Sequence, residues 1–343
     1  MALFILLLVT ACNQSVHVEE VVVLEGHYSL VDILPDNQLL LDKEEPVTLN
    51  DGKVALYVLD DQELSPLSLP DDDTCVTGTY YERPSMLPDG RLGLVKFCVA
   101  SLSEPLAERG DHTLIALDLD SYTIAPIMEQ PLYSVRQGSF TWNPDMSKGV
   151  MSVGYLAGTL HWLTPQGPEP MQVWVGDGQQ QWSLAEALKH LTCATLCNSD
   201  SLPVGIARTP DWSLDGSTIA FTASPAAMSL EGPFRLYAPY RLYLMDVIEL
   251  KPNVATDNLY QPQLVRWSPD SQRLLLDACA GLTRRCGLWI YSLTSGSLEW
   301  VTTRDHSQGV AWLSESEIVM GYCVEAEGNE CRQTAIREIH LDE

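Results

Sequence analysis

Residues 267–303 decide the fold, because this stretch (WSPDSQRLLLDACAGLTRRCGLWIYSLTSGSLEWVTT) contains one complete structural unit. Its opening, Pro269-Asp270-Ser271, is typical of a tight turn, since proline presets φ and aspartate hydrogen-bonds to nearby backbone. Short apolar or alternating segments, which are typical of β-strands, follow at 274–276, 288–293 and 298–302. Together with the segment before the turn, 262–267, they predict four short antiparallel strands.

The same signature recurs along the chain, with a hydrophobic or Trp position before a Ser/Asn-Pro-Asp-Gly-like turn. Successive turns are about 56 residues apart, close to the roughly 50 residues of a kelch-type propeller blade. We therefore expect an all-β fold, a six-bladed β-propeller of four-stranded antiparallel blades. Because the first and last copies match poorly, seven blades is an alternative. Recurrence at a turn indicates a structural role, which we assign to the turn residues Asp36, Asp89, Asp145, Asp215 and Asp270, with Glu315 in the equivalent place of the sixth copy.

The two ends of the chain are expected to meet in one blade. The sixth copy has a candidate third strand at 334–341, and no fourth strand follows it in the sequence. An apolar segment at 18–24 (VEEVVVL) precedes the first copy and has no other role. We predict that this segment supplies the outer strand of the last blade and closes the ring, because closure removes exposed strand edges.

These repeats resemble a known family. The Trp-Ser-Pro-Asp-Gly-like signature, followed by an apolar strand and a strand of the type at 288–293 (LWIYSL), is similar to the TolB-like (WD40-like) β-propeller repeat. The resemblance covers about residues 25–341 and is strongest at 205–302. It implies the fold much more than a function. Oligopeptidase-like enzymes have similar repeats, but no part of this chain is left over to form their hydrolase domain.

The first residues resemble an export signal. Residues 3–9 (LFILLLV) are too few to cross a bilayer as a helix, which needs about 20 apolar residues, and they fit the apolar region of a secretory signal. Val9-Thr10-Ala11-Cys12 resembles a bacterial lipobox. This resemblance implies a signal segment, 1–12, a lipid on Cys12, and a single propeller domain, 13–343, in the periplasm or on the cell surface.

The signal departs from the usual pattern in one respect. Residues 1–8 contain no Lys or Arg, although a signal normally opens with positive charge. A start upstream of Met1 would explain the difference. Plain secretion and a buried first strand are the alternatives to a lipoprotein.

The nine cysteines fit an oxidising compartment. Setting Cys12 aside, nine minus one leaves eight, an even number, and these eight fall as near neighbours in the sequence. Disulfides persist in exported proteins, so we predict local bridges, although eight cysteines allow about a hundred connectivities. The candidate pairs are Cys75/Cys98, Cys193/Cys197, Cys279/Cys286 and Cys323/Cys331.

One segment has a helical pattern. Residues 182–191 (WSLAEALKHL) place three leucines on one helical face, and Ser183 and Glu186 form a capping box. This segment lies in an insertion at about 176–203, between the third and fourth copies. We expect the insertion to form a small helical cap on one face of the disc. Such loops often carry function, although a surface decoration is the alternative.

Charge and motifs exclude some functions. The chain has 20 Lys and Arg against 46 Asp and Glu, a formal net charge of −26, whereas nucleic-acid binding needs clustered basic residues. No nucleophile elbow, zincin pair or phosphate-binding loop occurs, so we assign no catalytic residue and no metal site. His190, Cys193 and Cys197 have ligand-like spacing, but a disulfide is the preferred interpretation. The acidic run 71–73 could contribute to Ca²⁺ binding, although we prefer a solvated loop and expect no other cofactor.

The sequence therefore favours a binding or scaffold module over an enzyme. We expect a monomeric, lipid-anchored propeller whose partner is a protein, peptide or glycan of the cell envelope, bound on one face around the centre of the ring and the insertion. It would touch the membrane through its lipid anchor only. The alternative is a hydrolase or lyase with its site at the mouth of the central channel, with Ca²⁺ as the candidate metal.

Overall fold

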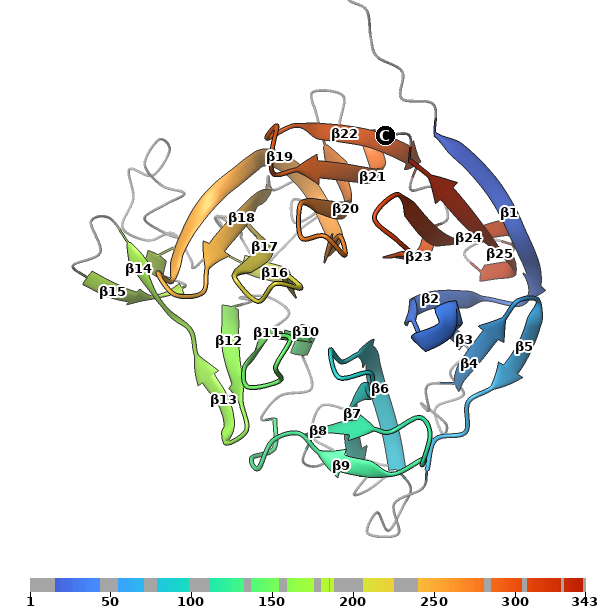
Figure 1. Cartoon of the computed structure of the whole chain (residues 1–343), viewed down its shortest axis with the longest axis horizontal. Helices are drawn as coiled ribbons and strands as arrows, with labels where there is room; N and C mark the ends of the chain where they lie inside the picture. Colours follow the sequence, from blue (N-terminus) through green and yellow to red (C-terminus); the bar gives the residue numbers. More distant parts are fainter. Residues whose placement is uncertain are drawn as a thin grey trace, which may run out of the picture.

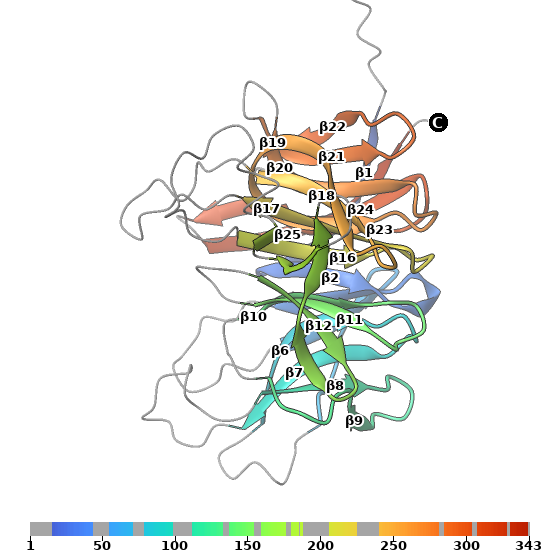
Figure 2. The same cartoon turned by 90° about the vertical axis from the view of Figure 1, so that its left-hand side faces the viewer.

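The computed structural model shows an all-β ring around a central axis (Figure 1), and Figure 2 shows the same ring from the side. Within the described residues, helical turns are short and rare. No helix among them is long and apolar enough to cross a membrane. The structure describes residues 16–43, 55–70, 79–98, 112–132, 137–153, 159–175, 180–184, 186–187, 206–224, 240–280, 285–303, 307–327 and 330–341.

Four sheets of the ring are separate four-stranded antiparallel blades. In each sheet the strand nearest the axis, here called the inner strand, comes just before a signature turn. In the first blade this turn is a short 3₁₀ segment, η1 (Pro35–Asn37). The strands are β2 (Tyr28–Ile33), β3 (Leu39–Lys43), β4 (Ala55–Asp60) and β5 (Glu63–Pro66); β6 (Thr79–Met86), β7 (Leu92–Cys98), β8 (His112–Leu117) and β9 (Ile124–Pro126); β10 (Gln137–Trp142), β11 (Gly149–Val153), β12 (Thr159–Thr164) and β13 (Gly167–Pro170); and β23 (Ser307–Trp312), β24 (Glu317–Glu327), β25 (Glu330–His340) and β1 (His17–Glu25).

The rest of the ring is one larger sheet of seven strands. Its middle strand, β19, pairs with β18 through residues 251–259 and with β20 through residues 260–267. The prediction of six separate four-stranded blades is therefore wrong, since the ring has four such blades and this larger sheet. The physical reason is that no turn interrupts β19. The strands are β16 (Ile206–Trp212), β17 (Thr218–Ser224), β18 (Tyr240–Asp246), β19 (Lys251–Trp267), β20 (Arg273–Ala280), β21 (Arg285–Ser292) and β22 (Leu298–Thr303).

The ring closes as the sequence predicts. The N-terminal strand β1 pairs antiparallel with β25, from His17 opposite His340 to Glu25 opposite Gln333. It is the outermost strand of the sheet that also contains β23 and β24. The first and last parts of the chain are thereby joined by antiparallel strand pairing, interrupted by a register shift between Glu20 and Val22, and Leu24 is buried.

Apolar clusters between neighbouring sheets hold the ring together. One cluster joins the first two blades, and others follow around the ring to the junction of β23–β25 with β2 and β3. A further cluster lies between the two halves of the seven-stranded sheet, where Leu242 packs with Leu274 and Trp267. Burial of each large apolar side chain is worth about 1.5–3 kcal/mol, so these inter-sheet contacts dominate stability.

The described part of the insertion lies at the outer rim of the ring. Its strand β15 (Gln180–Ser183) pairs with β14 (Gln172–Val175), which precedes the insertion. Figure 1 places this two-stranded hairpin outside β18 and β19. The predicted capping box is present, since Ser183 N donates to Glu186 Oε2 at 3.2 Å and Glu186 N donates to Ser183 Oγ at 3.4 Å. Leu184 and Ala187 of the insertion pack into the apolar cluster beside β16–β18, and the expected position of the whole insertion on a face of the disc stays a prediction. Residues 188–205 lie outside the described residues.

Candidate functional site

Every inner strand contains an irregularity just before its signature turn. The pairing register of each inner strand with the next strand shifts there, which is the mark of a β-bulge. Arg83, Thr209, Gln261 and Gly309 have positive φ at or beside these shifts. Bulges increase strand twist and redirect side chains, so they set the orientation of the residues between each bulge and its signature turn.

The residues four positions before the turn residue form an equivalent set, here called the inner positions. Two of them, Asp32 and Asp211, make the same contact. Asp32 Oδ2 accepts a hydrogen bond from Met86 N at 3.0 Å, and Asp211 Oδ2 accepts one from Trp267 N at 2.7 Å. Each carboxylate thus connects its inner strand to the inner strand of the next repeat. The inner positions are Asp32, Ser85, Thr141, Asp211, Arg266 and Ala311.

Asp211 is the most perturbed carboxyl of this set. Burial raises the pKa of Asp211, while the positive charge of Arg266 opposes the rise. Arg266 Nη1 lies 3.4 Å from Asp211 Oδ1, and the Thr141 hydroxyl also donates to this carboxylate. Asp211 is therefore a buried acceptor shared by three repeats, which fits a structural connection between them.

The signature tryptophans connect the same strands. Trp267 Nε1 donates to the Asp211 carbonyl at 3.2 Å, and Trp312 Nε1 donates to the Arg266 carbonyl at 3.3 Å. In each case the indole reaches back to the inner position of the preceding repeat. The tryptophan that makes the motif visible in the sequence is thus part of the contact between repeats, and its ring is buried there.

The predicted turn residues lie in the turns, and most of them hold the turn backbone. Asp145 accepts from Ser147 N at 2.9 Å, Asp215 from Ser217 N at 2.9 Å, and Asp270 from Gln272 N at 3.0 Å. Asp89 accepts from Arg91, both from its backbone nitrogen and from its guanidinium. Asp36 differs, since it lies in η1 with φ of 66°.

Hydrogen bonds from serine lower the pKa of a turn carboxylate. In the fourth repeat the Ser213 hydroxyl is the largest cause of the lowered pKa of Asp215, and Ser217 adds to it. Asp215 is therefore ionised at neutral pH, and it is one of the carboxylates of the signature turns. They lie on one side of the disc, here called the turn face, which carries the turns between the first two and between the last two strands of each blade.

Neighbouring signature turns touch one another along part of the turn face. Asp215 N donates to Ser271 Oγ at 3.4 Å, and Arg273 Nη2 donates to the Glu315 carbonyl. A Cβ on Gly216 would lie 3.3 Å from Pro144 Cδ, so those two turns are also in contact distance. The turn face between β10 and β24 is thus closely packed.

A cleft of about 740 Å³ lies on the turn face where the last blade meets the first. We call it the seam cleft. Buried Leu39, Leu59 and Val319 form its floor, and exposed Asp36, Asp60 and Asp61 lie at its mouth. None of its lining residues is Lys or Arg, so its charge is negative. The remaining lining residues are Val21, Asn37, Gln62, Leu313 and Glu338.

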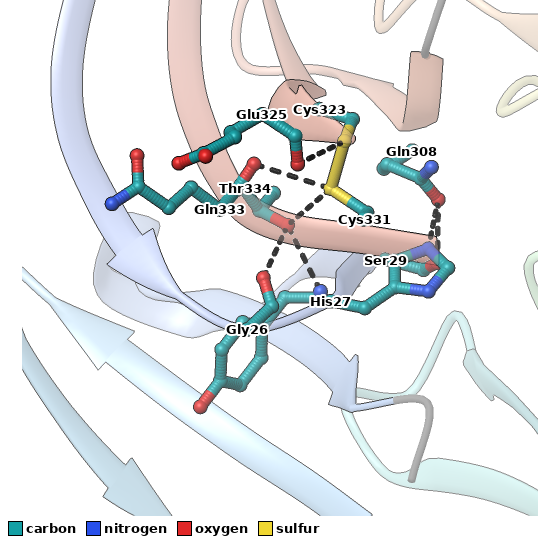
Figure 3. Close-up of a disulfide and its surroundings, with 10 residues drawn as sticks. Gly26, His27, Ser29, Gln308, Cys323, Glu325, Cys331, Gln333 and Thr334 are labelled. Atoms are coloured by element: carbon teal, nitrogen blue, oxygen red, sulfur yellow. Dashed lines mark hydrogen bonds between the residues drawn. A yellow bond between two sulfur atoms is a disulfide. The ribbon is translucent and has the colours of Figure 1, made fainter. Parts of the chain in front are cut away.

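Two of the candidate disulfides lie on the opposite side of the disc from the turn face. Cys279–Cys286 joins β20 to β21, and Cys323–Cys331 joins β24 to β25. Figure 3 shows the second bridge beside the point where β1 turns into β2. There the Thr334 hydroxyl donates to the Gly26 carbonyl and accepts from Tyr28 N, both at 3.0 Å.

Several predicted residues lie outside the described residues and are not placed. They include the proposed lipidation site and the ligand-like trio near the insertion. The described residues contain no group of three or more His, Cys, Asp or Glu side chains that could hold a metal ion. The unplaced residues are Cys12, Asp71, Asp72, Asp73, Cys75, His190, Cys193 and Cys197, together with the side chain of Cys98.

Sequence reasoning missed the inner positions and the seam cleft. A signal for the former is present, because five of the six inner positions are polar although they lie within strands. For the seam cleft, the signal in the sequence is the acidic pair Asp60-Asp61 at a turn, but no local pattern indicates that this pair lies near the last blade.

Comparisons with known proteins bear on the fold. No protein-family model matches the sequence, and no curated protein matches it. TolB from Acinetobacter baumannii is a structural match with 14% identity and a TM-score of 0.54, covering 89% of this chain. The match spans 64% of the length of that TolB chain.

Oligogalacturonate lyases are similar at the same level. A lyase in complex with manganese has 12% identity and a TM-score of 0.53, over 97% of this chain and 95% of the lyase. The lyase from Vibrio parahaemolyticus has 13% identity and a TM-score of 0.52, with the same coverage. Identities this low establish the fold alone, and they agree with the repeat signature that this chain has the fold of a TolB-like β-propeller.

Proposed function

We propose that this protein is an extracytoplasmic, lipid-anchored β-propeller that binds a protein of the cell envelope through its turn face. The observation that carries the proposal is the seam cleft, a depression on a closed ring with an apolar floor and carboxylates at its mouth. The net charge of −26 supports a partner with basic patches, since complementary charge steers association. A ring held by inter-sheet clusters offers such a partner a preformed surface.

Several features support the architecture and location in this proposal. The closed ring of four four-stranded blades and one seven-stranded sheet is the architecture on which the proposal rests. The two disulfides fit an oxidising compartment. The lipobox-like Cys12 is the proposed anchor, residues 13–343 are the proposed single domain, and a monomer is expected.

The anchor and the partner are tested with one variant. Cys12→Ser should move the protein from the membrane fraction to the soluble exported fraction, whereas persistent membrane attachment would exclude a lipid on Cys12. The released full-length protein then serves as bait for envelope extracts. A second bait lacks residues 188–203 and keeps the buried Leu184 and Ala187, so it reports on what residues 188–203 contribute to binding. Recovery of no partner, together with turnover in a hydrolase or lyase screen, would overturn the binding function.

A second candidate is a hydrolase or lyase at the centre of the ring. The observation that favours it is the raised pKa of the buried Asp211 carboxyl, because perturbed carboxyls cluster at active sites. Oligogalacturonate, with Mn²⁺ or Ca²⁺ added, is the first substrate to test. Formation of an unsaturated product that is lost in Asp211→Asn would favour the enzyme, and no product with either metal would count against it.

A further inference from the structure

We propose that the seam cleft binds a basic, extended segment of the partner protein, with an apolar side chain on the cleft floor and Lys or Arg side chains at its mouth. This inference rests on the proposed function and adds the partner's chemistry. It also assigns recognition to one place on the turn face, the junction between the last and first blades.

The seam differs on this face from the junctions between the third and sixth copies. Along those junctions the signature turns touch, for example through Asp215 N and Ser271 Oγ or through Arg273 and the Glu315 carbonyl. At the seam, the turn that contains Leu313 and the η1 turn instead line opposite parts of one depression. Pairing of β1 with β25 closes the ring at this junction, because β1 leads directly into β2 of the first blade.

The floor of the cleft selects an apolar group. Leu39, Leu59 and Val319 are between 1% and 9% exposed, and the cleft reaches all three. Leu313 and Val21 line its sides and are partly buried. A leucine-sized side chain that displaces water from this floor gains apolar contact without leaving a polar atom unpaired, and apolar burial is the general source of such affinity.

The mouth of the cleft selects positive charge. The Asp36 and Asp61 carboxylates have no salt bridge to any described residue. Asp60 accepts a hydrogen bond from the Gln38 amide at 2.9 Å, which orients its carboxylate without neutralising it. Glu338 Oε2 lies 4.0 Å from Nε2 of His340, a basic residue on the same strand. Lys or Arg on either side of the apolar anchor would therefore meet uncompensated carboxylates in partly exposed positions, where ion pairs form at little desolvation cost.

The chain is compared with two short synthetic peptides of equal length, one alternating leucine with lysine and one alternating leucine with glutamate. The bait is the full chain carrying Cys12→Ser. We expect saturable binding of the lysine peptide and none of the glutamate peptide. The double variant Asp60→Asn/Asp61→Asn should weaken binding roughly tenfold. Asn tolerates the positive φ of residue 61, so this variant keeps the turn.

A matched control removes two carboxylates from the same face at a distance from the cleft. Asp120→Asn/Glu249→Gln changes the net charge equally, at exposed turns of other sheets. This control should bind the lysine peptide like the parent protein, whereas Leu313→Ala should weaken binding by reducing the apolar wall. Equal losses in both double variants would overturn the proposal, because net charge alone would then explain binding. Binding of the glutamate peptide, or no binding of either peptide, would overturn it as well.

The same variants separate this inference from the proposed function. If the bait recovers an envelope partner and Asp60→Asn/Asp61→Asn recovers it equally well, the seam cleft is excluded while the binding function stands. If the parent bait recovers no partner, the binding function itself is at fault.

Discussion

The seam between the last and first blades and the β18–β20 junction both join neighbouring parts of the ring, but they do so through different contacts. At the β18–β20 junction one unbroken strand, β19, belongs to both halves of the sheet, and Asp211 connects the neighbouring inner strands. At the seam no covalent continuity joins β25 to β2 directly. Backbone pairing of β1, a close approach of Gly309 to Leu30, and the hydroxyl of Thr334 take its place.

The two junctions differ in whether a covalently continuous strand or noncovalent contacts hold them together. A covalently continuous junction keeps its two halves together even when a side-chain contact is lost. The seam depends on a few close contacts, and it also carries the cleft. The site proposed for recognition is therefore next to the junction that relies most on noncovalent contacts, and substitutions there should test both stability and binding.

Gly309→Ala should have the largest effect on stability. Gly309 has φ of 86°, and a Cβ at this position would overlap the Leu30 carbonyl, so the inner strands of the last and first blades must move apart. We expect a loss of roughly 3 kcal/mol or more in the free energy of unfolding. Denaturant unfolding followed by tryptophan fluorescence measures it.

Gly90→Ala is the matched control for this substitution. Gly90 has φ of 84°, almost the same, but an added Cβ would meet nothing within 4 Å. Its cost should therefore be limited to the backbone preference, about 1–2 kcal/mol. If both substitutions lower the free energy of unfolding equally, the close approach of Gly309 to Leu30 contributes nothing to stability, and the seam does not depend on it.

The sequence predicts the repeat and the closure because both depend on local patterns. Turn chemistry around Asp270 and alternation in the following strands are visible without any knowledge of neighbours. The blade count was wrong because β19 joins two strands without a turn between them, and local patterns do not reveal which neighbour each half pairs with. The seam cleft combines Leu313 with Leu59 and Asp60, which are far apart in the chain, so only the closed ring reveals it.

Asp211→Ala should have the next largest effect. It leaves the backbone nitrogen of Trp267 and the guanidinium of Arg266 without their buried acceptor. Loss of a hydrogen bond to a buried charged group costs about 1.5–3 kcal/mol. Asp211→Asn keeps an acceptor oxygen and should cost less. An equal loss in both variants would show that shape at residue 211, rather than hydrogen bonding, holds this junction.

The pH dependence of Asp211 has a definite sign. Burial raises its pKa in the folded state above the ordinary value of 3.8, so the folded protein holds this proton more tightly than the unfolded chain. The stability that the protonated Asp211 carboxyl contributes is fully present below pH 3.8, and it is lost as the pH rises through the raised pKa. The stability of the parent protein relative to Asp211→Asn should therefore fall as the pH rises above about 4. A constant difference across that range would contradict the raised pKa.

Thr334→Val should have the smallest effect and act locally at the seam. Thr334 is fully buried, and its hydroxyl both accepts from Tyr28 N and donates to the Gly26 carbonyl. Valine has a similar shape but no hydroxyl, so Tyr28 N and the Gly26 carbonyl lose this hydrogen-bond partner, at a cost of about 1–2 kcal/mol. Thr334→Ser retains the hydroxyl and is the matched control. Hydrogen exchange should accelerate at the Tyr28 amide in the valine variant and stay unchanged at the Trp267 amide, because β19 holds that junction by covalent continuity. Equal acceleration at both amides would mean that the ring opens as one unit, and the seam would then be no weaker than the junction through β19.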